Sequence, residues 1–169
     1  IIMYVNFVFI SSFIGYSIGT APIVSYHYGA KNKDELHSIL KKSIIIVTIT
    51  SLVMFGVSYI FAEPISYLFV GYDSELLEMT VHQMDIYAFT YLFIGYCIYA
   101  SDFFTALNDG ITSAIISFLR LIVFEIGFLF ILPYFFGGDA IFVSTGIACA
   151  LADIVSLIFI IVYKNKYGY

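Results

Sequence analysis

The sequence has very few charged residues for its length. Only 11% of its 169 residues are charged, whereas 62% are hydrophobic. Soluble domains carry roughly 25% charged residues, so this chain has too little polar surface to cover a soluble globule. The composition therefore excludes a soluble domain and predicts a chain that lies in lipid.

The sequence also lacks the patterns of nucleic-acid binding, metal binding and secretion. The chain has seven basic and twelve acidic residues and no basic patch, so we expect no nucleic-acid partner. Cys97 and Cys149 lie in separate apolar runs, which favours two buried thiols over a disulfide. No paired Cys or His spacing suggests a metal site. The chain starts in an apolar run without a Met, a basic segment or a cleavage site, so we interpret its start as a truncation and not as a signal peptide.

Five apolar runs are long enough to cross a membrane, which takes about 20 residues in a helix. In the connection between the second and third runs, we expect a short interfacial helix at 65–70. We therefore predict an all-α membrane protein with one partial bundle over 1–169, with spans at about 3–26, 37–62, 82–107, 112–133 and 140–163.

The loop charges predict the orientation of these spans. Five alternating spans put six lysines on one side and only acidic loop residues on the other. Because positive loops stay in the cytoplasm, we expect a multi-pass protein of the plasma membrane with a cytoplasmic carboxy-terminus. The lysines are Lys31, Lys33, Lys41, Lys42, Lys164 and Lys166.

Four ionisable residues fall inside the predicted spans: Asp102, Arg120, Glu125 and Asp153. Such groups are costly in lipid and are usually functional or paired. At 1.5 Å per residue, the depth from the cytoplasmic side is roughly 8 Å for Asp102, 12 Å for Arg120, 15 Å for Asp153 and 20 Å for Glu125. At these depths Arg120 can meet Asp102 or Asp153 across adjacent helices. On a regular helix Arg120 and Glu125 point about 140° apart, which leaves Glu125 without a cation. A carboxylate of this kind can exchange protons or hold Na⁺; the alternative is a structural role for all four.

The third span carries an aromatic face that includes Tyr87, Tyr91 and Tyr99. Aromatic rings attract lipophilic cations, so these tyrosines are candidates for lining a substrate cleft. Ordinary helix packing or lipid contact is the alternative.

A short segment after the first span contains Pro22, Tyr26, Tyr28, Gly29 and Lys31. Pro22 should kink or loosen the helix, and Gly19 and Gly29 should permit turns around it. Tyr26 and Tyr28 are rings of the kind that settle at a membrane surface.

This segment resembles a motif of the multidrug and toxic compound extrusion (MATE) transporters. Its sequence is Pro22-Ile23-x-x-Tyr26-x-Tyr28-Gly29-Ala30-Lys31-Asn32. Two later motifs are similar to the carboxy-terminal half of that family. They are Phe103-Phe104-Thr105-Ala106-Leu107-Asn108-Asp109-Gly110 and Ser117-Phe118-Leu119-Arg120. Asp102 departs from the pattern, where a small or neutral residue is expected.

The resemblance implies helices eight to twelve of a twelve-helix, two-bundle transporter that is not an enzyme. Such transporters exchange small organic cations for H⁺ or Na⁺ by alternating access. The implied partners are membrane lipid, the organic cations and a missing amino-terminal half, with no cofactor beyond the coupling ion. Because five spans leave the cleft incomplete, we expect the chain alone to transport nothing.

Other functions remain open. A lipid-linked oligosaccharide flippase of the same superfamily would need several cationic groups for a pyrophosphate, and the spans contain only Arg120. A membrane-embedded enzyme would need a nucleophile with its base, a carboxylate dyad or His ligands, and no His lies deep in a span. A purely structural membrane subunit is the simplest alternative.

Overall fold

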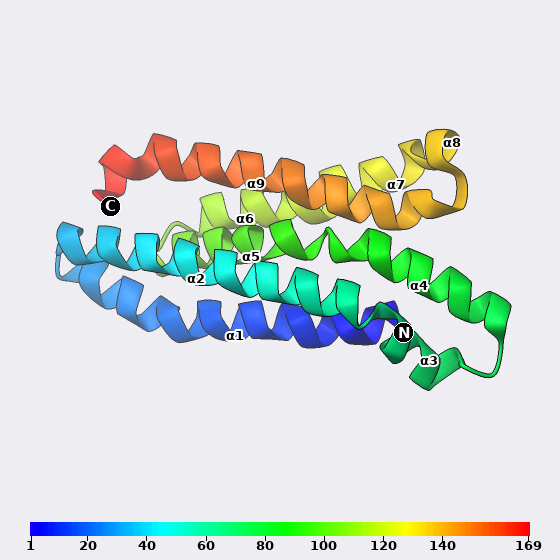
Figure 1. The fold of residues 1–169 in the computed structure, drawn as a ribbon. Coiled ribbons are helices and arrows are strands. Elements are labelled where there is room, and N and C mark those ends of the chain that lie inside the picture. Colours follow the sequence, from blue (N-terminus) through cyan, green and yellow to red (C-terminus); the bar gives the residue numbers. More distant parts are fainter.

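The computed structural model describes residues 1–169, of Phe136 only the backbone. The chain folds into long helical rods that run side by side, with connections at the two ends of the bundle (Figure 1). The helices are α1 (Ile2–Gly29), α2 (Lys33–Ile60), α3 (Ala62–Val70), α4 (Ser74–Ala88), α5 (Tyr91–Ala106), α6 (Gly110–Phe118), the π-helix η1 (Leu119–Ile126), α7 (Gly127–Ile131), α8 (Pro133–Phe136), the 3₁₀ turn η2 (Gly137–Asp139) and α9 (Ala140–Tyr167).

The first two rods are joined by a tight turn. α1 continues through Pro22 to Gly29, so the helix does not end at the proline. The predicted role of the glycines is wrong: Gly19 lies inside α1, and Lys31 has the positive φ of 55° in the turn. Asn32 then caps α2, because its side chain accepts a hydrogen bond from the Glu35 backbone N–H at 3.2 Å.

The third rod consists of two helices, α4 and α5. α4 begins at Ser74, eight residues before the predicted span, and its cap is Asp73, which accepts hydrogen bonds from the Glu75 and Leu76 backbone N–H groups. The helix breaks at Phe89 and Thr90, where the Thr90 N–H bonds the Tyr87 carbonyl at 2.9 Å. The single predicted run 82–107 is therefore a broken helix.

In the part of the chain that the structure describes, four helical segments are long and apolar enough to cross a membrane: Ile2–Gly29, Lys33–Ile60, Gly110–Phe135 and Gly137–Tyr167. Large apolar side chains cover their outer surfaces, as in Phe7, Ile49, Phe130 and Ile161. The surface of the bundle is thus suited to lipid, as the composition predicts.

Helix α5 lies at the centre of the bundle and packs against α1, α2, α6 and α9. It is buried on nearly all sides, with Tyr91, Phe103 and Phe104 among the largest fully buried side chains. A predominantly apolar helix belongs in such a position.

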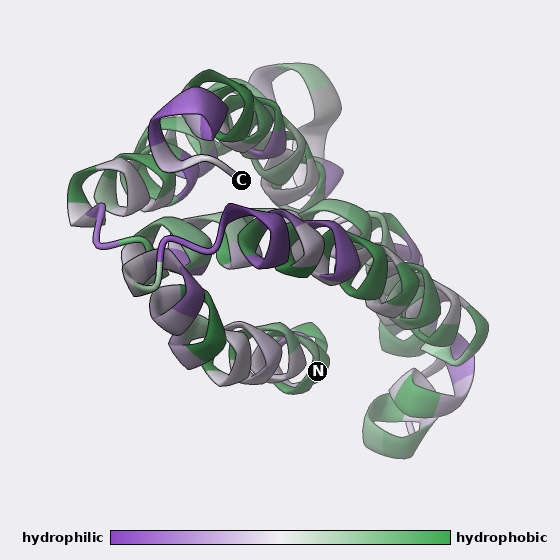
Figure 2. Ribbon diagram, turned by 90° about the vertical axis from the view of Figure 1, so that its left-hand side faces the viewer, coloured by the Kyte–Doolittle hydropathy of each residue, from purple (hydrophilic) through white to green (hydrophobic). Residues whose placement is uncertain are grey.

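One end of the bundle collects the polar connections. The carboxy-terminus, the α1–α2 turn and the α5–α6 turn lie together at that end, on the left of Figure 1. Figure 2 views the bundle from this end and shows hydrophilic residues around these turns and apolar residues along the rods. The loops predicted to share one side therefore do so.

Candidate functional site

Close packing of α1 on α5 sets the geometry of the interior. A Cβ atom on Gly95 would lie 2.5 Å from Cε1 of Phe13. The missing side chain therefore lets the Phe13 ring lie directly against the α5 backbone. This contact fixes one face of α5, and its other faces carry the polar groups described next.

Asp153 of α9 is the most buried of the four predicted intramembrane charges, with 7% of its surface exposed. Its Oδ1 accepts a hydrogen bond from the Cys97 thiol of α5 at 2.9 Å. Ser156, one turn further along α9, donates to the Ala152 carbonyl. The sequence did not single out Cys97 as a partner, because 56 residues separate it from Asp153.

Asp102 and Arg120 line the same cavity, which has a volume of about 270 Å³ and lies between α1, α5 and η1. Ser17 of α1 faces Asp102, and its buried hydroxyl is a polar neighbour of that carboxylate. The ion pairs found among the described side chains join His82 to Asp139 and Lys166 to Asp109. Arg120 thus lies near Asp102 without the close ion pair that the sequence allowed.

Beside this cavity, hydroxyl groups of α5 and α6 form hydrogen bonds with one another. Ser101 is 2.8 Å from the Ser113 hydroxyl and 2.9 Å from that of Ser117, and Thr105 donates to Ser113 at 2.8 Å. These bonds hold α6 against α5 and position η1.

Arg120 and Glu125 both belong to the π-helix η1. A π-helix bonds residue i to i+5 and turns by a smaller angle per residue than an α-helix. The angle of about 140° between the two side chains was predicted for a regular helix, which η1 is not. Glu125 is half-buried and lies within electrostatic range of Tyr87.

The three candidate tyrosines are buried within the bundle and do not form one continuous face. Tyr87 packs edge-on against Tyr91, with ring centroids 5.5 Å apart, and Tyr91 packs against Phe9 at 4.9 Å. Tyr99 stacks on Phe103 and lines a separate cavity between α2, α5 and α9.

The motif residues lie at the polar end of the bundle. Tyr26 is 71% exposed, whereas Tyr28 packs edge-on against Tyr167 with ring centroids 5.8 Å apart. Gly29 ends α1, and Lys31 forms the turn.

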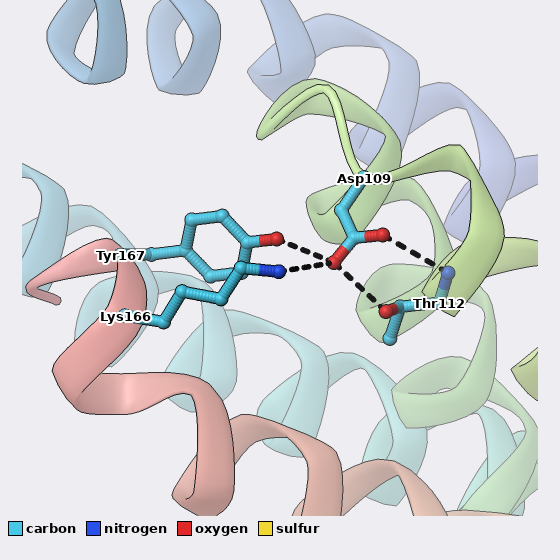
Figure 3. Close-up of polar contacts among 4 residues, drawn as sticks. All are labelled: Asp109, Thr112, Lys166 and Tyr167. Carbon is cyan, nitrogen blue, oxygen red and sulfur yellow. Dashed lines mark hydrogen bonds and ion pairs between the residues drawn. The ribbon is translucent and has the colours of Figure 1, made fainter.

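Asp109 organises a cluster at the same end, shown in Figure 3. It caps α6 by accepting hydrogen bonds from the backbone N–H and the hydroxyl of Thr112, at 3.1 and 2.8 Å. It also accepts a hydrogen bond from the Tyr167 hydroxyl and lies 3.6 Å from Lys166 Nζ. The Asp-x-x-Thr spacing is a cap signal that could have revealed the first half of this cluster.

The fold is that of solved MATE transporters. A multidrug resistance MATE family transporter in an inward-facing conformation matches with a TM-score of 0.90 and 18% identity, over 98% of this chain and 39% of that one. The Vibrio cholerae MATE transporter VcmN in its bent form matches with a TM-score of 0.85 and 19% identity, over 96% and 38%. A MATE structure in complex with MaL6 matches with a TM-score of 0.90 and 18% identity, over 98% and 38%. The chain thus spans about two fifths of the length of these transporters.

Among curated proteins, none matches this chain. The family model MatE matches residues 1–131, which is most of the chain. The predicted fold class, an all-α membrane protein with part of a MATE-type bundle, is confirmed. This chain belongs to the MatE family of membrane transporters.

Proposed function

We propose that the chain forms part of an antiporter that exports organic cations in exchange for H⁺ or Na⁺. The observation that carries this proposal is Asp153, a carboxylate buried in the bundle with a thiol as its hydrogen-bond partner. A buried carboxylate is costly unless a proton or a cation neutralises it. Such a group can link the uptake of one positive species to the release of another.

The chain supplies helices eight to twelve in this proposal, and an amino-terminal half supplies the other wall of the cleft. The solved transporters of this fold are more than twice as long as the chain, which leaves room for that half. The polar end with the lysine-rich turn faces the cytoplasm of a plasma-membrane protein, in accord with the positive-inside rule. On its own, the chain lacks one wall of the cleft and transports nothing.

Glu125, Arg120 and Asp102 are the other candidates for coupling. Asp102 on α5 and Arg120 on η1 line one cavity. A cation in this cavity would be attracted by Asp102 and repelled by Arg120. Glu125 is half-buried on a π-helix, an element that is frequent at functional sites. These three residues and Asp153 lie on α5, η1 and α9, and both α5 and η1 pack against α9.

The test is ethidium movement in proteoliposomes that contain the full transporter, with pH and Na⁺ gradients imposed separately. Glu125→Gln, Asp153→Asn and Arg120→Ala are compared with the unmodified protein. Glu78→Gln is the matched control, because Glu78 is exposed on α4 and outside the proposed coupling sites. Loss of gradient-driven movement in Glu125→Gln or Asp153→Asn, but not in the control, identifies a coupling residue. If neither gradient moves ethidium through the unmodified transporter, the antiporter proposal fails.

A further inference from the structure

A continuous apolar groove follows α9 on the side that faces α2 and α4. The part nearer the polar end of the bundle is a cavity of about 460 Å³ between α2, α5 and α9. The part nearer the opposite end is a cavity of about 340 Å³ between α4, α5 and α9. Phe93 and Ala150 belong to the walls of both cavities, so the two join into one groove.

The groove is about as long as the apolar core of a membrane is thick. Along α9 it extends from Phe142 to Ile160, which is roughly 27 Å at 1.5 Å per residue. The hydrocarbon core of a bilayer is about 30 Å thick, so each leaflet contributes about 15 Å. The part nearer the polar end extends from Ala150 to Ile160, which is again roughly 15 Å. This part therefore matches the acyl region of a single leaflet.

The groove opens on the outer surface of the bundle. Both α2 and α9 pack against α5 but not closely against one another, and the groove lies between them. Ile154 and Leu157 form its outer edge and are 53% and 50% exposed. Asp153 also lies in the wall, and its Oδ1 accepts a hydrogen bond from the Cys97 thiol. An acyl chain can thus enter the groove sideways from the bilayer.

Two lysines continue the walls of the groove toward the polar end. On α9 the lining residues recur every three or four positions, and the next position of this series is Lys164. On α2, Lys41 lies one turn before the lining residue Ile44 and on the same face. Both lysines are exposed, and neither is in an ion pair among the described side chains. A positive charge therefore lies on each side of the groove at this end. The residues of the α9 series are Gly146, Ala150, Asp153, Leu157 and Ile160.

We propose that this groove binds an anionic phospholipid, with one acyl chain along α9 and the phosphate between Lys41 and Lys164. Basic residues between membrane helices at the cytoplasmic surface are suited to anionic headgroups. A zwitterionic lipid would fill the same groove, but its own cation would oppose the two lysines. The site does not depend on transport and therefore goes beyond the proposed function. With the polar end in the cytoplasm, as proposed above, the lipid belongs to the cytoplasmic leaflet.

The experiment is native mass spectrometry of the 169-residue chain in detergent, titrated with phosphatidylglycerol that carries palmitoyl and oleoyl chains. Phosphatidylcholine with the same chains tests the charge of the headgroup, and glycerol 3-phosphate tests the phosphate without chains. One phosphatidylglycerol should bind about tenfold or more tightly than phosphatidylcholine, because each lysine contributes about fivefold. Glycerol 3-phosphate should not bind, because it has no acyl chain to fill the groove.

Lys41→Gln and Lys42→Gln make the same chemical change at neighbouring residues of α2. Lys42 points about 160° away from Ile44 and so lies outside the groove. Lys41→Gln should weaken phosphatidylglycerol binding about fivefold, and Lys41→Gln with Lys164→Gln about tenfold or more, with phosphatidylcholine unchanged. Lys42→Gln should change either affinity by about twofold or less. Equal losses in the Lys41→Gln and Lys42→Gln variants would mean that diffuse surface charge attracts the lipid, which overturns the site.

Ala150→Phe tests the groove itself, because Ala150 lines both cavities and the two lysines stay in place. The added ring should weaken the binding of both phospholipids, and unchanged affinity in a folded variant overturns the site. The lysine variants keep the test decisive if Ala150→Phe does not fold, since Lys41 and Lys164 are exposed. Equal affinity for the two phospholipids also overturns the proposal and favours an apolar helix of an amino-terminal half as the occupant. If phosphatidylglycerol binds as expected but the full transporter moves no ethidium, the lipid site stands and the antiporter proposal fails.

Discussion

The hydroxyl of Tyr167 donates a hydrogen bond to the carboxylate of Asp109, which ties the end of α9 to the turn between α5 and α6 (Figure 3). Lys166 adds a positive charge to the same carboxylate. The Tyr167 ring also packs against Tyr28 at the end of α1. The three connections at the polar end of the bundle are thus joined through one side chain.

Tyr167→Phe should lower the free energy of unfolding by about 1 kcal/mol, because the ring remains and only the hydrogen bond to a charged group is lost. The measurement is unfolding in mixed detergent micelles, followed by circular dichroism. Tyr26→Phe is the control, since Tyr26 is 71% exposed. Equal stability of the two variants would show that the Asp109–Tyr167 bond contributes nothing.

The stability supplied by Asp109 should depend on pH. Burial raises the pKa of Asp109, but hydrogen bonds from Tyr167 and Thr112 and the charge of Lys166 outweigh this and lower it to about 2. An unfolded Asp has a pKa of about 3.9, so the folded state favours the ionised form. The contribution is therefore complete above about pH 4 and is lost as the pH falls through about 2.

Asp109→Asn tests this pH dependence, since Asn caps helices as well as Asp does. The difference in unfolding free energy between the unmodified protein and the variant should be constant near neutral pH and shrink as the pH falls below about 4. A difference that stays the same down to about pH 2 contradicts the lowered pKa.

Helical spans were predictable because each needs a long apolar run, and α1, α2 and α9 follow directly from such runs. The break at Phe89 and Thr90 was not predictable, because no Pro or Gly marks it. The π-helix η1 was likewise not predictable, because no distinctive amino-acid composition separates it from an α-helix. A connection between the spans 3–26 and 37–62 was predicted, but the positive φ of Lys31 was not, because such a φ is expected at Gly and here the residue after Gly29 and Ala30 adopts it.

Individual residues of the candidate site were predictable from the sequence, but the contacts between them were not. Hydropathy and depth were enough to select Asp153 as an intramembrane charge, but its Cys97 partner lies on another helix. Similarly, depth allowed Arg120 to pair with Asp102, and the structure places both on one cavity without a close ion pair. Contacts between distant helices depend on how the rods pack, which periodicity alone does not determine.

Gly95→Ala should destabilise the bundle by about 1–3 kcal/mol, because the added Cβ would lie 2.5 Å from Cε1 of Phe13 and force the ring to move. Gly15→Ala on α1 is a matched control, since nothing lies within 4 Å of the Cβ position there. Replacing Phe13 by Leu in the Gly95→Ala background should restore part of the loss. A Gly95→Ala protein as stable as the Gly15→Ala control would refute the close contact.

The hydroxyl of Tyr96 donates to Thr48 Oγ1 at 2.8 Å and links α5 to α2 beside the cavity of Asp153. A double-mutant cycle with Tyr96→Phe and Thr48→Val should give a coupling energy of about 0.6 kcal/mol, the average for such bonds between membrane helices. The measurement is the unfolding free energy of both single variants and the double variant in mixed micelles. Tyr16 and Ser43 form a comparable bond at 2.9 Å between α1 and α2, so Tyr16→Phe paired with Thr48→Val serves as the uncoupled control. Additive losses in the Tyr96–Thr48 cycle would mean that the two hydroxyls prefer other partners, and α2 would then be held on α5 by apolar packing alone.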